Sequence, residues 1–136
     1  MLKKISFCGL SHLGLVYTSV YSNFSKKIVC YDENEILIND LSKKKININE
    51  PNLNKELNKS FKKITFTNEI NDIAKSDLIF ISLDVPTDLK GNSNYNKIYN
   101  ILKLIKKNKL NNSPVIILSQ LYPGFCNELI KKFNNP

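Results

Sequence analysis

Two patterns of apolar residues alternate along this chain. Short apolar runs are typical of strands that are covered on both faces of a sheet. They predict strands at residues 5–8, 28–31, 63–67, 78–83 and 114–119. The stretches between them predict helices at residues 13–24, 33–41, 51–60, 69–74, 95–107 and 125–133. Apolar residues recur every three or four positions most clearly in 13–24 and 95–107, as expected for helices with one buried face.

Alternating strands and helices predict a doubly wound α/β fold, with a parallel sheet of about five strands. Ligands of such sheets bind beyond the carboxyl ends of the strands, where the strand order reverses. Four segments that follow predicted strands are expected to converge there. They are residues 9–13, Asp32, residues 83–87 and residues 119–121. Their convergence predicts a nucleotide-binding site.

The first of these segments is a glycine-containing turn, Gly-Leu-Ser-His-Leu-Gly, that leads into a helix. In dinucleotide-binding units a first glycine permits the turn, a second lets the backbone approach a pyrophosphate, and a third lets the helix pack against the strand. Gly9 and Gly14 hold the first and third places, and Ser11 holds the second. The Cβ of Ser11 narrows the approach, whereas its hydroxyl is able to donate to a phosphate oxygen. Two glycines also occur in such turns for packing alone, so the turn by itself leaves both interpretations open.

Asp32 ends the second predicted strand, roughly 20 residues after the glycine turn, where an acidic residue accepts the hydroxyls of an adenosine ribose. A carboxylate at this place repels a 2′-phosphate, so NAD is favoured over NADP as the cofactor. The alternative is that Asp32 caps the helix predicted at 33–41. The two roles are compatible.

Length, charge and cysteine content narrow the function class. A length of 136 residues suits one domain. The net charge is +8, but every basic residue is Lys and no aromatic residues interleave with the lysine runs, so we expect no nucleic-acid partner. The three cysteines lack metal-ligand spacing and there is one histidine, so we expect no metal site. Without a bilayer-spanning run or a signal-peptide pattern, we expect a cytoplasmic protein with no membrane partner.

Four segments, in this order, resemble the N-terminal NAD-binding domain of the UDP-glucose/GDP-mannose dehydrogenase family, which has a Rossmann-like fold. Residues 4–16 resemble its opening, which normally contains Gly-Leu-Gly-Tyr-Val-Gly. Residues 49–53 resemble its Glu-Pro-Gly-Leu segment, and residues 74–87 resemble its fourth strand and Pro-Thr loop. Residues 119–124 resemble its Ser-Thr-Val-Pro-Pro-Gly turn. Each segment is a modest signal, but together they are specific and cover nearly the whole chain.

The resemblance implies an oxidoreductase that converts the C6 alcohol of a nucleotide sugar, such as UDP-glucose, to the carboxylate with two NAD. It also implies which residues bind the cofactor. These are Gly9, Leu10, Ser11, His12, Leu13, Gly14, Asp32, Leu83, Asp84, Val85, Pro86, Thr87, Ser119, Gln120 and Leu121. Gln120 stands where a Thr near the reacting centre is usual, so it is also the candidate catalytic residue, with an amide that holds a water or positions the cofactor.

The sequence departs from the family pattern at several places. Ser11 replaces the middle glycine, Leu37 stands where a Lys or Arg near the adenosine is frequent, and Asn52 replaces the glycine of Glu-Pro-Gly-Leu. By resemblance, the sixth strand, the central helix through which the family forms oligomers, and the substrate domain with the catalytic Cys and Lys would follow residue 136. We therefore expect residues 1–136 to be a dinucleotide-binding domain that needs a C-terminal domain to bind the sugar and complete the reaction.

Two other interpretations stay open at this point. The chain could be a stand-alone Rossmann module that binds NAD, or no ligand, and works through a partner. It could also be another class of enzyme on a similar fold, such as a methyltransferase that uses the same turn for its cofactor. The Pro-Thr loop and the turn at 119–124 favour the dehydrogenase.

Overall fold

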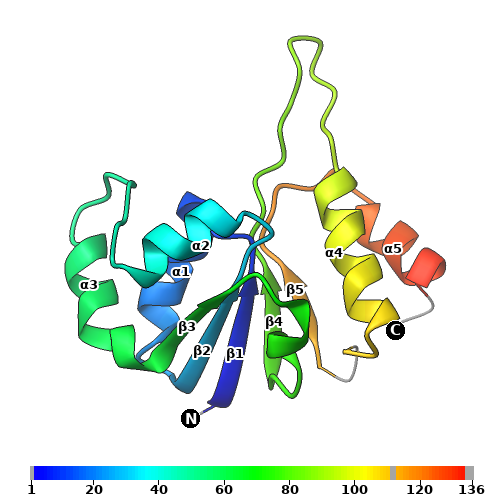
Figure 1. Ribbon diagram of the computed structural model, residues 1–136. Coiled ribbons are helices and arrows are strands. Elements are labelled where there is room, and N and C mark those ends of the chain that lie inside the picture. The colour runs from blue at the N-terminus through cyan, green and yellow to red at the C-terminus, as the bar shows by residue number, and fades with distance from the viewer. Residues whose placement is uncertain (1, 111–112, 134–136) are drawn as a thin grey trace.

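A computed structural model describes residues 2–110 and 113–133, and these form one parallel sheet with helices on both faces (Figure 1). The sheet strands are β1 (Leu2–Cys8), β2 (Ser25–Tyr31), β3 (Ile64–Thr67), β4 (Leu78–Ile81) and β5 (Val115–Ile117). Their order across the sheet is β3-β2-β1-β4-β5, and every neighbouring pair is parallel. The predicted doubly wound α/β fold is therefore confirmed. The strand order reverses at β1, between β2 and β4.

The helices divide into two layers. The α-helices are α1 (His12–Tyr21), α2 (Glu35–Ser42), α3 (Leu53–Ser60), α4 (Asn96–Lys107) and α5 (Phe125–Phe133). Two short 3₁₀ helices, η1 (Phe61–Lys63) and η2 (Ile70–Ile73), flank β3. One layer contains α1, α2 and α3, and the other contains α4 and α5 (Figure 1). None of the helices in the described part of the chain has the length and apolar character needed to cross a bilayer.

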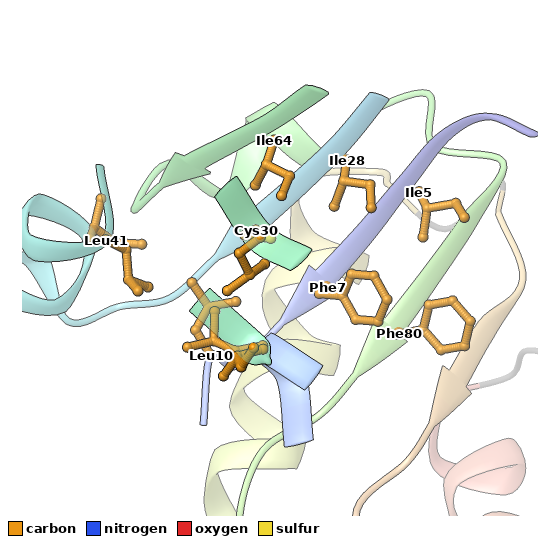
Figure 2. Close-up of a cluster of buried hydrophobic side chains, with 12 residues drawn as sticks. Ile5, Phe7, Leu10, Ile28, Cys30, Leu41, Ile64 and Phe80 are labelled. Carbon is orange, nitrogen blue, oxygen red and sulfur yellow. The ribbon is translucent and has the colours of Figure 1, made fainter. Parts of the chain in front are cut away.

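Each face of the sheet has its own hydrophobic core, because successive strand residues point to opposite faces. Phe7 and Phe80, from the adjacent strands β1 and β4, stack in parallel under α1 with ring centroids 4.9 Å apart. Figure 2 shows them with the other large side chains of this core. The opposite core packs α4 and α5 against Val29, Ile79 and Ile81. A sheet covered on both faces explains why its strands were visible in the sequence as apolar runs.

Several predicted boundaries differ from the observed ones. Helix α1 ends at Tyr21 instead of residue 24, because the amides of Asn23 and Phe24 bond to carbonyls three residues earlier and form a turn. Pro51 precedes α3 rather than opening it, and the N-cap residue Asn52 takes a left-handed conformation with φ 62°. The predicted helix at 69–74 is the 3₁₀ helix η2. Strand β4 ends at Ile81, two residues earlier than predicted.

Candidate functional site

The turn after β1 is fastened on both sides to the ends of its neighbouring strands. On the β2 side, the amide of Gly9 donates to the carbonyl of Tyr31 at 2.9 Å. On the β4 side, the amide of Ser82 donates to the carbonyl of Cys8, also at 2.9 Å. The turn, the end of β2 and the end of β4 therefore meet where the strand order reverses, as the sequence predicted.

Both glycines of the turn are required by close packing. Gly9 has φ +96°, and a Cβ there would come within 2.7 Å of the side chain of Leu83. A Cβ on Gly14 would overlap the carbonyl oxygen of Gly9 and lie 2.8 Å from the hydroxyl of Ser82. Gly14 thus lets the start of α1 press against the turn and the end of β4. This is the packing role that the third glycine has in a dinucleotide-binding unit.

Two serines connect the turn to the end of β4, and we call this pair the serine clamp. The hydroxyl of Ser82, which is fully buried, donates to the carbonyl of Gly9 at 2.7 Å. The hydroxyl of Ser11 donates to the carbonyl of Ser82 at 3.1 Å. Ser11 is the N-cap residue of α1, yet its side chain makes no capping hydrogen bond. The one proton of this hydroxyl thus binds the protein in this structure, and its role toward a phosphate stays a prediction.

Asp32 is held at the end of β2 by two backbone amides. One carboxylate oxygen accepts from Leu10 N at 2.9 Å, and the other accepts from Asn34 N at 3.0 Å. The alternative role as helix cap is wrong, because α2 begins later than predicted and its cap is Asn34, which accepts from Leu37 N at 3.1 Å. Asp32 borders a small depression between the glycine turn and α4. The lining residues are Gly9, Tyr31, Asp32, Glu33, Leu83, Lys97, Asn100, Ile101 and Leu104.

The segment after β4 is only partly at this depression. Leu83 lines it beside Gly9, but from Asp84 onward the chain enters a long loop that rises away from the sheet (Figure 1). Pro86 and Thr87 instead border an open cavity of about 610 Å³ on that loop, together with Tyr95 at its base. The structure therefore does not bring the Pro-Thr pair beside Asp32.

The segment after β5 lies next to the end of β4. The hydroxyl of Ser119 donates to the carbonyl of Leu83 at 2.6 Å and joins the two strand ends. Gln120 is exposed and Leu121 is half-buried. These residues border the same end of the sheet as the glycine turn, in agreement with the predicted convergence.

Sequence reasoning missed some neighbours of the site. Lys97 and Asn100 reach the depression from α4, and no motif marked them. His12, at the start of α1, pairs with Glu50 at 2.9 Å between Nε2 and Oε2. Glu50 belongs to residues 49–53, one of the four segments that resemble the family, but that resemblance did not predict its contact with His12. Among the described residues, no group of three or more His, Cys, Asp or Glu side chains is arranged to hold a metal ion.

The sequence profile of the UDP-glucose/GDP-mannose dehydrogenase family, NAD binding domain, matches residues 3–135. The chain belongs to this family. The UDP-glucose 6-dehydrogenase TuaD of Bacillus subtilis is 30% identical over 133 residues, which cover 96% of this chain and 29% of that protein. The UDP-glucose 6-dehydrogenase of Rickettsia typhi is 27% identical over 130 residues, which cover 93% of this chain and 30% of that protein. The chain thus spans about 30% of the length of these curated relatives.

The fold agrees with this assignment. The UDP-D-ManNAc dehydrogenase of Pyrococcus horikoshii superposes with a TM-score of 0.87 at 19% identity, over 97% of this chain and 32% of that one. The chain is the NAD-binding domain of a UDP-glucose/GDP-mannose dehydrogenase family member, and NAD is its cofactor. The site residues fit a dinucleotide, because Gly9 and Gly14 keep the turn free of Cβ atoms and a carboxylate ends β2.

Proposed function

We propose that this chain is the cofactor-binding part of an NAD-dependent dehydrogenase that oxidises the C6 alcohol of a UDP-sugar to the carboxylate. The observation that carries the proposal is the meeting of the glycine turn with Asp32 at the reversal of strand order. The curated relatives TuaD and the Rickettsia typhi protein, both named UDP-glucose 6-dehydrogenases, support the substrate class. Sugar binding and the covalent chemistry would be supplied by another part of the enzyme.

The start of α1 would receive the pyrophosphate. The first amides of a helix have no partner within the helix, and the helix dipole favours negative charge there. In this chain those amides belong to His12, Leu13 and Gly14. The serine clamp fixes the turn before any ligand arrives. NAD binding would therefore cost little conformational entropy of the backbone.

The carboxylate of Asp32 would accept the hydroxyls of the adenosine ribose. Two backbone amides already orient this carboxylate. The fold therefore also sets the directions in which its remaining lone pairs accept hydrogen bonds. The same negative charge would repel a 2′-phosphate, and Glu33 adds a second carboxylate to the depression. NAD supplies the hydride acceptor when bound. Leu83, with Asp84 and Val85 beyond it, and residues 119–121 would border the rest of the cofactor, and Gln120 would position it or a water near the reacting carbon.

Calorimetric titration of the chain with NAD and with NADP tests this proposal. We expect NAD to bind at least about tenfold more tightly, which corresponds to about 1.4 kcal/mol. Asp32→Asn should weaken NAD binding and reduce the preference over NADP. Asp40→Asn is the matched control, because Asp40 lies on α2, pairs with Lys45 in the following loop and does not border the depression. Equal or tighter binding of NADP by the parent chain would contradict the proposal.

A further inference from the structure

The side chains of His12 and Glu50 are in contact at the start of α1. Nε2 of His12 lies 2.9 Å from Oε2 of Glu50, and the two side chains are 55% and 37% exposed. His12 is the first residue of α1, and Glu50 lies in the loop that connects α2 to α3. The pair therefore places a carboxylate beside the turn that, on the proposed function, receives the pyrophosphate of NAD.

The charges around this turn are unusual for a chain with a net charge of +8. Residues 9–14 and the rest of α1 contain no Lys, so His12 is the only side chain there that is able to become positive. The segments that meet at the turn contribute carboxylates from Asp32 and Glu50.

Helix α3 packs against α1 and carries three charged side chains. They are Lys55, Glu56 and Lys59. Glu56 and Lys59 pair with each other at 2.7 Å. Lys97 borders the depression beside Gly9, but within α1 itself the charge depends on whether His12 carries a proton.

We propose that the His12–Glu50 pair couples NAD binding to the uptake of a proton by His12. When His12 is protonated, the pair is neutral and the turn presents amides to the pyrophosphate without an opposing charge. When His12 is neutral, the Glu50 carboxylate is left unbalanced beside the dianion. A ligand that binds the protonated form better draws protons onto the protein by linkage.

The direction of the pH dependence follows from the charges. Histidine is the side chain that ordinarily changes charge between pH 5 and 8, whereas carboxylates ordinarily stay ionised across this range. NAD affinity should therefore be higher at pH 5.5 than at pH 8.5, because the Glu50 carboxylate opposes the pyrophosphate when the imidazole beside it is neutral. For one unit charge at a solvent-exposed site we expect a change of about three- to fivefold between pH 5.5 and 8.5.

Isothermal titration calorimetry tests the proposal directly. Titrations at pH 7 in buffers of different ionisation enthalpy should show a fractional uptake of protons for each NAD bound. His12→Gln should abolish both this uptake and the pH dependence of the affinity. Glu50→Gln should tighten NAD binding about threefold at pH 8.5, because the unbalanced carboxylate is gone.

Glu56→Gln is the matched control, since it removes the same charge from an exposed pair on α3 and should leave proton uptake unchanged. The coupling proposal is overturned if His12→Gln keeps the parent pH dependence, or if Glu50→Gln weakens binding at pH 8.5. A chain that binds no NAD at any pH, in every variant, would instead overturn the proposed function. The two failures are therefore distinguishable.

Discussion

Gly14→Ala should destabilise the domain, although alanine is the better helix former. The added methyl group would overlap the carbonyl oxygen of Gly9 and lie 2.8 Å from the hydroxyl of Ser82. Neither atom is at the end of a flexible chain, because one is backbone and the other is a short buried side chain that donates to Gly9. Helix α1 therefore has to move away from the turn.

The size of the effect follows from three contributions. Overpacking a well-filled interior costs about 1–3 kcal/mol. Displacing the Ser82 hydroxyl from the Gly9 carbonyl costs about 1 kcal/mol more. The helix propensity of alanine returns up to about 1 kcal/mol. We expect a net loss of about 2 kcal/mol in the free energy of unfolding, a large part of the stability of an ordinary domain.

Urea unfolding followed by circular dichroism measures this loss. With a urea m-value of about 1–3 kcal/mol/M, the midpoint should fall by about 1 M. Ser82→Ala is the control, because it removes the hydrogen bond without adding volume. The double variant Gly14→Ala/Ser82→Ala should recover part of the loss but not all, since the Gly9 carbonyl stays in place. A Gly14→Ala chain as stable as the parent would refute the close approach of α1 to the turn.

Three further predictions use other parts of the molecule. Ser11→Gly removes the hydrogen bond to the Ser82 carbonyl and should lower the free energy of unfolding by about 1 kcal/mol. NAD binding should tighten by no more than about tenfold, and weaker binding would make the serine itself a ligand. Phe80→Ala should cost about 3–5 kcal/mol, because it removes a stacked ring from the core, and a small change would mean that the core collapses around the gap. Burial raises the pKa of both Cys8 and Cys30 from 9.0 to about 12. The folded chain thus favours the protonated thiols, and the free energy of unfolding should be intact below pH 9 and fall as the pH rises towards 12. Denaturation at pH 8 and at pH 10 measures this loss of stability. The prediction would be contradicted if Cys30→Ala lost as much stability between the two pH values as the parent chain.

The fold was predictable because its strands are buried on both faces. Runs such as residues 78–83 leave few alternatives to a parallel sheet strand, and each strand predicted in this way is present. The residues at which helices and strands begin and end were harder to predict from the sequence. Whether α1 stops at Tyr21 depends on turn hydrogen bonds, and the start of α3 depends on a left-handed Asn52. Such local geometry is not encoded in hydrophobic periodicity.

The site was predictable where it depends on topology and unpredictable where it depends on side-chain geometry. Parallel strands end at the same edge, so the meeting of the turn with Asp32 followed from the strand order. Pro86 and Thr87 follow the same rule along the chain, but the loop that carries them leaves the edge. The clamp between Ser11 and Ser82 joins residues far apart in sequence, and no spacing rule marks such a pair.

The serine clamp also bears on the order in which the domain folds. Ser82 lies 73 residues along the chain from Gly9, and β4 pairs with β1 only after β2 and β3 have been made. Closing so long a loop is slow compared with forming β1, α1 and β2, which are contiguous. The first three strands would thus have left the ribosome well before the end of β4 packs against the turn. The dinucleotide site is consequently expected to be a late product of synthesis, which emerges only when β4 docks.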